Sequence, residues 1–169
     1  METNVKSDAD ISKDKVILNE FLDCNLDDYI KGDIGDIPIS PTLLNNGSDP
    51  LSEENLNKSL DLVNDIRLSC SQKSIWLYTG YKVVGIIDGF WGVEPNVITN
   101  KILDPDKLVK GINDAKKRSD IISKCDVLID GQYIDSQRDI SLPYRGSKNQ
   151  RLIDIQKSLQ KGEIVLWQT

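Results

Sequence analysis

The chain has 169 residues, enough for one compact domain with a single hydrophobic core. Its hydrophobic fraction of 38% and charged fraction of 28% are ordinary for a soluble globular protein, and no apolar run is long enough for a membrane span. The net charge of −6 argues against nucleic-acid binding, which requires clustered Lys and Arg. The polar, acidic N-terminus lacks the apolar stretch of a secretory signal, so we expect a cytoplasmic protein that does not bind membranes.

The chain contains three cysteines and no histidine. Cys24, Cys70 and Cys125 are far apart in the sequence, and no two of them have the spacing of metal ligands, so we predict no metal site. An odd number of cysteines without a secretory signal indicates free thiols in a reducing compartment. The absence of histidine removes the commonest general base and the commonest zinc ligand.

The first 41 residues carry weak structural signals. Residues 1–14 are strongly charged and are predicted to be disordered. Residues 15–30 place apolar side chains at helical spacing, which favours a short amphipathic helix. Glycines and prolines punctuate residues 32–41, which we predict to be a loop.

Strand and helix signals alternate from residue 42 onward. Residues 42–45 are a strand candidate, and Ser52 is predicted to cap a helix that ends at about Ser69. Residues 74–79 form an apolar, β-prone run that indicates a buried strand. Residues 82–103 contain a further strand candidate interrupted by glycines.

The second half of the chain repeats this pattern. Asp104 and Pro105 are predicted to start a helix as N-cap and first residue, with an inner face formed by Leu108, Ile112, Ala115 and Ser119. The consecutive Lys116, Lys117 and Arg118 indicate either a basic patch or a solvated helix face, and we favour the solvated face. Residues 125–129 are a strong strand candidate. In the tail, residues 150–155 and 163–167 could be strands, with a helical turn at 157–161.

This alternation predicts an α/β fold with a mostly parallel sheet built from βαβ units. In such sheets, ligands bind beyond the carboxyl ends of the strands. That rule selects residues 46–50, 79–81 and 130–133 as candidate ligand-binding segments.

Each of these segments permits a functional and a purely structural interpretation. Gly47 would let the backbone approach a ligand and Asp49 would suit an ammonium group, but the same residues make an ordinary strand-to-helix turn. Thr79 offers a hydroxyl at a strand end, or simply a turn. Asp130 could hold a cationic or hydroxyl-bearing ligand, or it could cap the following turn.

A fourth segment, residues 145–151, places two arginines around small and amide side chains. Arginine forks pair well with carboxylates and phosphates. The alternative is an exposed polar loop whose surface ion pairs contribute little. The residues concerned are Arg145, Gly146, Ser147, Asn149, Gln150 and Arg151.

These segments, taken in order, resemble the anaerobic ribonucleoside-triphosphate reductase activating proteins. SIWLYTGY at residues 74–81 is similar to the IW-x-TGY strand of that family, and CDVLIDGQY at 125–133 is similar to its DVLVDG-x-Y segment. RGSKNQRLIDIQKSL at 145–159 resembles the family tail RGSxNQRIIDVQKSL, and GSDPL at 47–51 resembles its GGDPL loop. The similarity covers residues 42–169 apart from 83–103.

The resemblance implies an incomplete (β/α) barrel of the radical S-adenosylmethionine (radical-SAM) type. Members of the family hold a [4Fe–4S] cluster on a CxxxCxxC loop and use SAM to generate a glycyl radical on the large subunit of an anaerobic ribonucleotide reductase. That subunit is therefore the implied partner. By resemblance, the SAM-binding residues would be Gly47, Ser48, Asp49, Thr79 and Asp130.

The chain departs from the family pattern at the cluster loop. Residues 1–41 contain one cysteine and nothing like CxxxCxxC, although such a cluster needs several thiolates. Cys70 and Cys125 precede strands and are predicted to be small buried hydrophobic residues. We therefore expect residues 42–169 to form an activase-like domain behind a divergent segment at 15–41, in a degenerate or truncated relative without radical-SAM activity. The alternatives are an active enzyme whose cluster ligands are unrecognisable here, and a non-catalytic α/β protein-binding module.

Overall fold

The computed structural model describes residues 36–40, 48–94 and 104–168. The predicted disorder at 1–14, the amphipathic helix at 15–30 and the strand at 42–45 all lie outside these residues. The division of the chain at residues 14 and 41 therefore stays a prediction.

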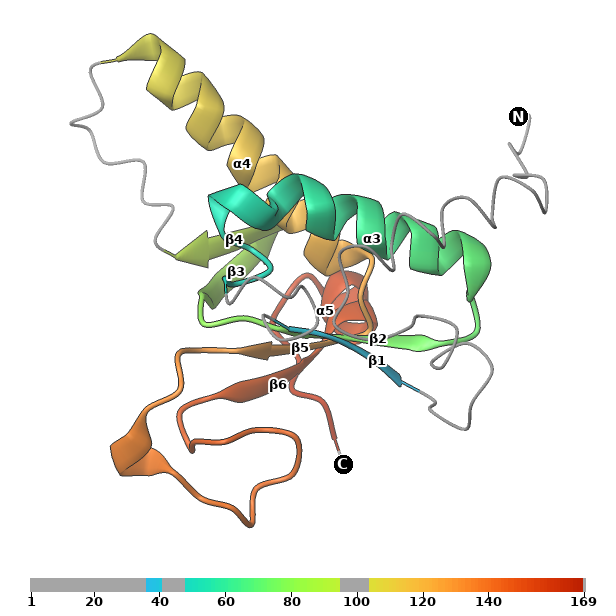
Figure 1. Cartoon of the computed structure of the whole chain (residues 1–169), viewed down its shortest axis with the longest axis vertical. Coiled ribbons are helices and arrows are strands. Elements are labelled where there is room, and N and C mark those ends of the chain that lie inside the picture. The colour runs from blue at the N-terminus through green and yellow to red at the C-terminus, as the bar shows by residue number, and fades with distance from the viewer. Residues whose placement is uncertain (1–35, 41–47, 95–103, 169) are drawn as a thin grey trace.

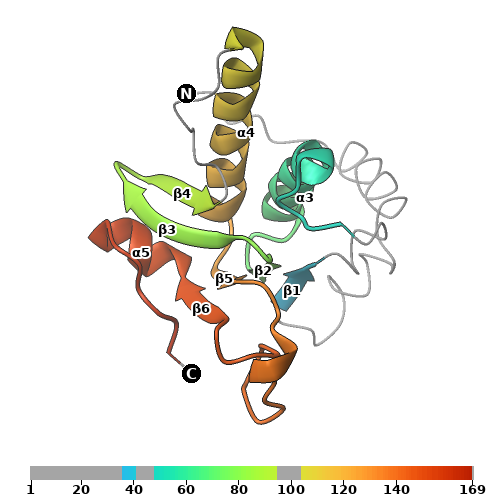
Figure 2. The ribbon, with the colours of Figure 1, turned by 90° about the vertical axis from the view of Figure 1, so that its left-hand side faces the viewer.

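Four strands form a single mixed sheet: β1 (Asp36–Ile39), β2 (Ser74–Tyr78), β5 (Val127–Asp130) and β6 (Arg151–Asp154). They lie in the order β1-β2-β5-β6, with the first three parallel and β6 antiparallel to β5 (Figure 2). The predicted α/β fold with a mostly parallel sheet is confirmed. Within the described residues this sheet does not close into a barrel, and the incomplete barrel stays a prediction.

The predicted loop at residues 32–41 is wrong in its second half, because residues 36–39 form strand β1. Pro38 has no N–H to donate, but β1 is the edge strand of the described sheet and pairs only with β2. Ile37 and Ile39 alternate with Pro38 and are fully buried. The period-two burial of these isoleucines outweighs the turn signal of the prolines.

Three helices and a short 3-10 turn lie on one face of the sheet (Figure 1). They are η1 (Glu53–Asn55), α3 (Leu56–Ser69), α4 (Pro105–Ser123) and α5 (Ile155–Lys161). The main core lies between them and the sheet, and includes Leu62, Ile66, Leu77 and Ile121. Helix α3 ends where predicted, but Ser52 does not cap it, since its hydroxyl donates to the Asp49 carbonyl at 2.7 Å.

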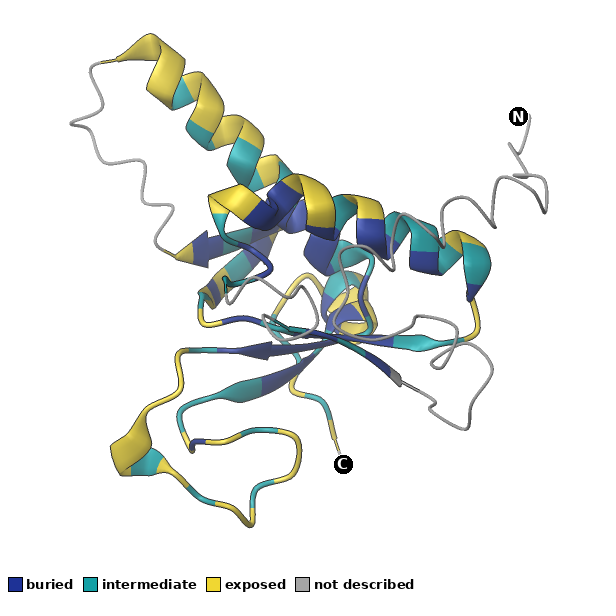
Figure 3. Cartoon of the chain, in the orientation of Figure 1, coloured by how far each residue is buried: buried dark blue, intermediate teal, exposed yellow. Residues whose placement is uncertain are grey.

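Helix α4 begins at the predicted residue, but fewer of its side chains are buried than predicted. The Asp104 carboxylate accepts from the Asp106 N–H at 3.0 Å, which confirms the N-cap. Of the four residues of the predicted inner face, only Ser119 is buried, and Ile112 is 39% exposed. The first turns of α4 extend past the sheet, as the exposed residues in Figure 3 show.

Arg118 is neither in a basic patch nor on a solvated face, because its side chain is buried. Its Nε donates to the Leu51 carbonyl at 2.7 Å, and its guanidinium lies 5.4 Å from the centroid of the Tyr81 ring. Tyr81 therefore lies on the side of the sheet that the helices cover, where it packs against the main core.

The glycine-rich segment after β2 forms an antiparallel hairpin of β3 (Lys82–Ile87) and β4 (Phe90–Glu94). Asp88 and Gly89 connect the strands with φ values of 50° and 78°, the left-handed pair typical of a type I′ turn. The hairpin packs on α4, where the Trp91 N–H donates to the Ser119 hydroxyl at 2.9 Å. The predicted strand is therefore confirmed as β3, and the glycines do not break the region up.

The opposite face of the sheet, which we call the aromatic face, carries Trp76, Val127, Ile129 and Leu152. The Trp76 ring lies 4.7 Å from Tyr144 and 5.0 Å from Trp167 between ring centroids. The tail is held against β6, because the Trp167 N–H donates to the Leu152 carbonyl at 2.9 Å. The strand predicted at residues 163–167 is present only as a single β-bridge between Leu166 and Ile153.

No helix in the described part of the chain could cross a membrane.

Candidate functional site at the carboxyl edge of the sheet

The segments that follow β1, β2 and β5 meet at one edge of the sheet, since these strands are parallel. We call this the carboxyl edge and define it by residues 48–51, 79–81 and 130–133. The Thr79 N–H donates to the Ile129 carbonyl at 3.0 Å, and the Gly131 N–H donates to the Tyr81 carbonyl at 3.0 Å. The three segments selected from the sequence therefore lie side by side, apart from residues 46 and 47, which are outside the described part.

Asp49 joins the first two segments through its carboxylate. Its Oδ1 accepts from the Thr79 hydroxyl at 2.8 Å and from the Leu51 N–H at 2.9 Å, and its Oδ2 accepts from the Gly80 N–H at 2.6 Å. Since a carboxylate oxygen can accept two hydrogen bonds, Oδ2 keeps one acceptor position. Asp49 is half-buried, and the neighbouring Gly80 is exposed. The Ser48 carbonyl accepts from Asn55 Nδ2 at 3.1 Å.

Asp130 is directed into the protein. Its side chain is 1% exposed and pairs with Arg151, whose Nε donates to Oδ1 at 3.0 Å and whose Nη2 donates to Oδ2 at 2.5 Å. Oδ2 also accepts from the Val83 N–H at 2.9 Å, while Arg151 Nη2 donates to the Val83 carbonyl at 2.7 Å. The nearby Asp130 carboxylate raises the pKa of Arg151, more than burial lowers it. These contacts support a structural role that fixes the start of β3, and the predicted ligand contact of Asp130 stays untested.

The segment 145–151 holds the loop that follows β5. Gln150 Oε1 accepts from the Gly146 and Ser147 N–H groups at 3.0 and 3.1 Å, and Nε2 donates to the Gly131 carbonyl at 3.1 Å. Asn149 Nδ2 donates to the Gln132 carbonyl at 2.7 Å, and its Oδ1 accepts from the buried Ser147 hydroxyl at 2.6 Å. The amide side chains therefore fix the backbone of the carboxyl edge, a role that the sequence alone did not reveal.

Two glycines permit this arrangement. Gly131 adopts a φ of 98°, which disfavours any residue with a Cβ. A Cβ on Gly146 would lie 3.1 Å from the Tyr133 ring carbons, so glycine is what allows that ring to approach the segment.

A cavity of about 500 Å³ opens on the aromatic face at the carboxyl ends of β2 and β5. Three tyrosines and one arginine dominate it, and we call it the tyrosine cavity. Its lining consists of Tyr78, Ile129, Tyr133, Tyr144, Arg145, Gly146 and Gln150. Tyr133 is 47% exposed and Tyr144 is 52% exposed, so both rings are available to a partner. The Tyr133 hydroxyl donates to Asp135 at 3.0 Å, and desolvation, followed by this hydrogen bond, raises the pKa of Tyr133.

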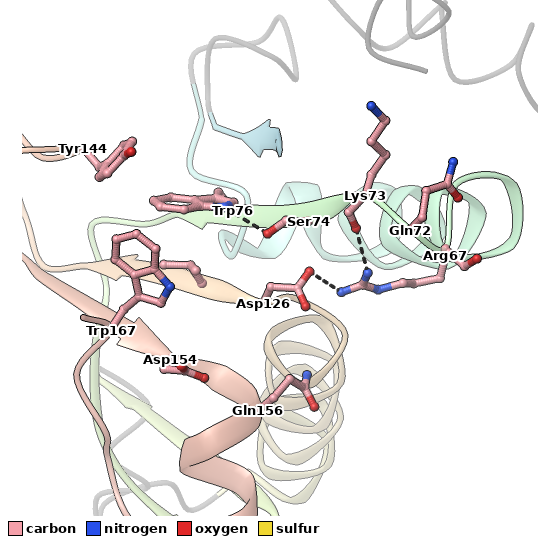
Figure 4. Close-up of a pocket in the computed structure, with 12 residues that line it drawn as sticks. Arg67, Gln72, Lys73, Ser74, Trp76, Asp126, Tyr144, Asp154, Gln156 and Trp167 are labelled. Atoms are coloured by element: carbon pink, nitrogen blue, oxygen red, sulfur yellow. Dashed lines mark hydrogen bonds and ion pairs between the residues drawn. The ribbon is translucent and has the colours of Figure 1, made fainter. Parts of the chain in front are cut away.

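A further cavity lies at the amino ends of β2 and β5 (Figure 4). The polar side chains that line it already contact other parts of the protein: Arg67 pairs with Asp126 at 2.7 Å and donates to the Lys73 carbonyl at 3.1 Å. Asp126 also accepts from the Ile75 N–H at 2.8 Å. Trp76 and Trp167 form its aromatic side.

Cys70 and Cys125 are free thiols with no exposed surface. Cys70 follows α3 and Cys125 precedes β5, which places both near the amino ends of the strands, opposite the carboxyl edge. Burial raises the pKa of Cys125 to about 12, and its Sγ donates to the Ile121 carbonyl at 3.2 Å. The prediction that both are buried hydrophobic residues is confirmed.

A mostly parallel α/β sheet with its loops gathered at the carboxyl edge is the fold class expected of an enzyme or ligand-binding domain. The chain matches the model of the 4Fe-4S single cluster domain over residues 12–153 and belongs to that family.

Among individual proteins, the chain is similar to anaerobic ribonucleoside-triphosphate reductase-activating proteins. It is 30% identical to that of Vibrio cholerae and 31% identical to that of Escherichia coli K12, in each case over 126 residues and 74% of this chain. It is 34% identical to that of Haemophilus influenzae over 104 residues. These alignments cover 63%, 64% and 49% of the respective relatives, so the chain spans between half and two thirds of their length. No solved structure matches the chain. The resemblance found in the sequence is confirmed.

The described cysteines do not fit a [4Fe–4S] cluster. Such clusters are held by thiolates that converge on the irons, whereas Cys70 and Cys125 are buried and lie near the opposite end of the sheet from the carboxyl edge. No group of three or more Cys, His, Asp or Glu side chains among the described residues could hold a metal ion. Cys24 lies outside the described residues, and it is the chain's one further cysteine.

The sequence did not point to Tyr78 or Tyr144 as site residues. Tyr78 belongs to the IWLYTGY strand and was recognisable as facing away from Leu77 by the period of two. No sequence pattern pointed to Tyr144, because its place over the sheet depends on the path of a loop in which Tyr144 itself has a φ of 62°.

Proposed function

We propose that this chain is a non-catalytic relative of the activating proteins, which binds a partner protein through the tyrosine cavity and does not hold a cluster itself. One observation carries the proposal: the described thiols are buried at the end of the sheet opposite the carboxyl edge. With one further cysteine in the sequence, the chain offers no converging set of thiolates. The relatives are named as activating proteins of the anaerobic ribonucleoside-triphosphate reductase, and the partner that we propose is the large subunit of such a reductase.

The composition of the tyrosine cavity supports a protein partner. Tyrosine and arginine are enriched among the residues that dominate binding energy at protein interfaces. Two of the tyrosines are about half exposed, and the hydrogen bonds of Gln150 hold the surrounding backbone. A site fixed in this way loses little conformational entropy when a partner binds.

Anaerobic reconstitution of the full chain with iron and sulfide tests the absence of the cluster. We expect substoichiometric iron and sulfide, no absorbance of a [4Fe–4S] cluster, and no cleavage of added SAM. An activating protein with its CxxxCxxC loop, treated in parallel, serves as the positive control. A stoichiometric cluster that cleaves SAM would refute the proposal and favour the active-enzyme alternative.

Calorimetric titration with the purified reductase large subunit tests the partner. Tyr133→Ala should weaken binding at least tenfold, since truncating an aromatic residue that dominates an interface costs about 2 kcal/mol. Phe90→Ala removes an aromatic ring of similar exposure, 41%, on the hairpin and should change the affinity less than twofold. Equal effects of the two variants, or no binding by the parent protein, would contradict this part of the proposal.

The free acceptor position on Asp49 favours a second candidate function, the binding of SAM through its ammonium group without its cleavage. Gly47, Ser48 and Thr79 would line the same site. We expect saturable binding of SAM in equilibrium dialysis, and Asp49→Asn should weaken it about tenfold, the loss of one charge-assisted hydrogen bond. Absence of SAM binding would remove this function and leave the partner-binding role standing.

A further inference from the structure

A separate cavity of about 390 Å³ lies between β6, the tail and the segment that precedes β6. It is distinct from the tyrosine cavity, with which it shares only Arg145 and Gln150. Its lining combines three basic side chains with an apolar wall, and contains no carboxylate: Pro143, Arg145, Lys148, Gln150, Arg151, Leu152, Leu166 and Trp167. We call it the basic cavity. This basic lining is opposite in sign to the net charge of the chain, which is −6.

The three cations differ in how far they are already neutralised. Arg151 is paired with Asp130 and contributes little net charge. Arg145 and Lys148 have no ion-pair partner within 4.0 Å among residues 36–40, 48–94 and 104–168. Hydrogen bonds from Ser141 chiefly lower the pKa of Asp139, and the charge of Lys148 lowers it less strongly.

Arg145 supplies the most direct indication of a ligand. Its Nε is enclosed by protein and makes no hydrogen bond within the described structure. An enclosed donor of this kind costs free energy unless a bound group accepts from it, and the cost is larger when the donor carries charge. The rest of the same side chain lines the basic cavity, so an oxyanion bound there that drew the guanidinium toward it would also give Nε an acceptor.

From these observations we infer that the basic cavity binds a small organic oxyanion, a phosphate or carboxylate that carries an apolar group. The guanidinium of Arg145 and the ammonium of Lys148 provide the donors that such oxygens require. Leu152, Leu166 and Trp167 provide the apolar wall for the remainder of the ligand. The volume lies in the range of small-molecule sites.

Titration of the full chain with phenyl phosphate, benzoate and inorganic phosphate tests this inference, with the indole N–H signal of Trp167 in NMR spectra as a local readout. We expect saturable binding of phenyl phosphate or benzoate, at least fivefold tighter than inorganic phosphate because of the apolar wall. Binding of only one of the two aromatic probes identifies the oxyanion as phosphate or as carboxylate. No saturable binding of either probe would overturn the inference.

Two substitutions assign the binding to this cavity. Arg145→Gln should weaken the binding of the preferred aromatic probe at least tenfold, while the Trp167 signal and the rest of the spectrum confirm that the variant is folded. Lys161→Gln removes an exposed positive charge outside the cavity and should change the affinity less than twofold. If both variants bind as the parent does, or lose affinity equally, the ligand is attracted by general charge and the inference fails.

Discussion

Replacing Asp130 with asparagine should destabilise the protein far more than its small change in volume suggests. The carboxylate is 1% exposed and accepts three hydrogen bonds, two from Arg151 and one from the Val83 N–H. The neutral amide keeps one acceptor atom and turns two N–H donors toward groups that also donate. Arg151 then lacks its counter-ion.

The expected magnitude follows from the burial of the pair. Removing one partner of a buried ion pair costs about 3–5 kcal/mol. Since the Arg151 side chain is 29% exposed and keeps its bond to the Val83 carbonyl, we expect the low end, about 3 kcal/mol in the free energy of unfolding. This is a large share of the roughly 5–15 kcal/mol by which small proteins are stable.

Equilibrium unfolding in urea, followed by circular dichroism, measures this loss. Glu53→Gln is the matched control, because Glu53 pairs with Lys110 at 2.9 Å but is 70% exposed. That variant should lose less than about 1 kcal/mol, the usual limit for a surface pair. If Asp130→Asn costs no more than Glu53→Gln, with equal urea dependence of the unfolding free energy, then Asp130 does not hold the start of β3 and our assignment is wrong.

Three further outcomes are expected. Because the pKa of the Cys125 thiol is raised from 9.0 to about 12 in the fold, its contribution to stability is complete below pH 9 and is lost above it, by about 1.4 kcal/mol at pH 10. Cys125→Ala should remove that part of the alkaline slope in urea unfolding, and an unchanged slope would contradict the burial of the thiol. Gly131→Ala should cost about 1–3 kcal/mol because its φ is 98°, whereas Gly111→Ala, in the open middle of α4, should stabilise by up to about 1 kcal/mol. The reverse order of these two melting temperatures would refute the backbone argument. Trp167→Ala should cost about 2 kcal/mol and abolish the near-ultraviolet dichroism of the ring cluster, while Trp167→Phe should retain most of both.

The sequence predicted the parts of the fold that depend on local pattern. The buried strands at 74–78 and 127–130 and the start of α4 at Pro105 follow from apolar runs and capping residues, and all are confirmed. Strand β1 was missed because Pro38 is tolerated only where a strand lies at an edge, which is a property of the assembled sheet.

The candidate site could be predicted in position but not in contacts. The rule for parallel sheets brought residues 79–81 and 130–133 together correctly. It could not reveal that Asp130 is neutralised by Arg151 across an antiparallel pair, since β6 was expected only as a possible strand of unknown direction. The burial of Arg118 was missed for the same reason, because its acceptor Leu51 lies 67 residues away in the sequence.

The pairing of the tail with β6 covers a strand edge that would otherwise be open to pairing with another chain. The backbone of residues 165–167 forms hydrogen bonds with the outer side of that strand. Their removal by proteolysis would leave those N–H and C=O groups bare beside the newly uncovered Leu152 and Trp76, which is the combination that recruits a strand from another molecule. A preparation trimmed at Gly162 should therefore aggregate while its helical content is still intact.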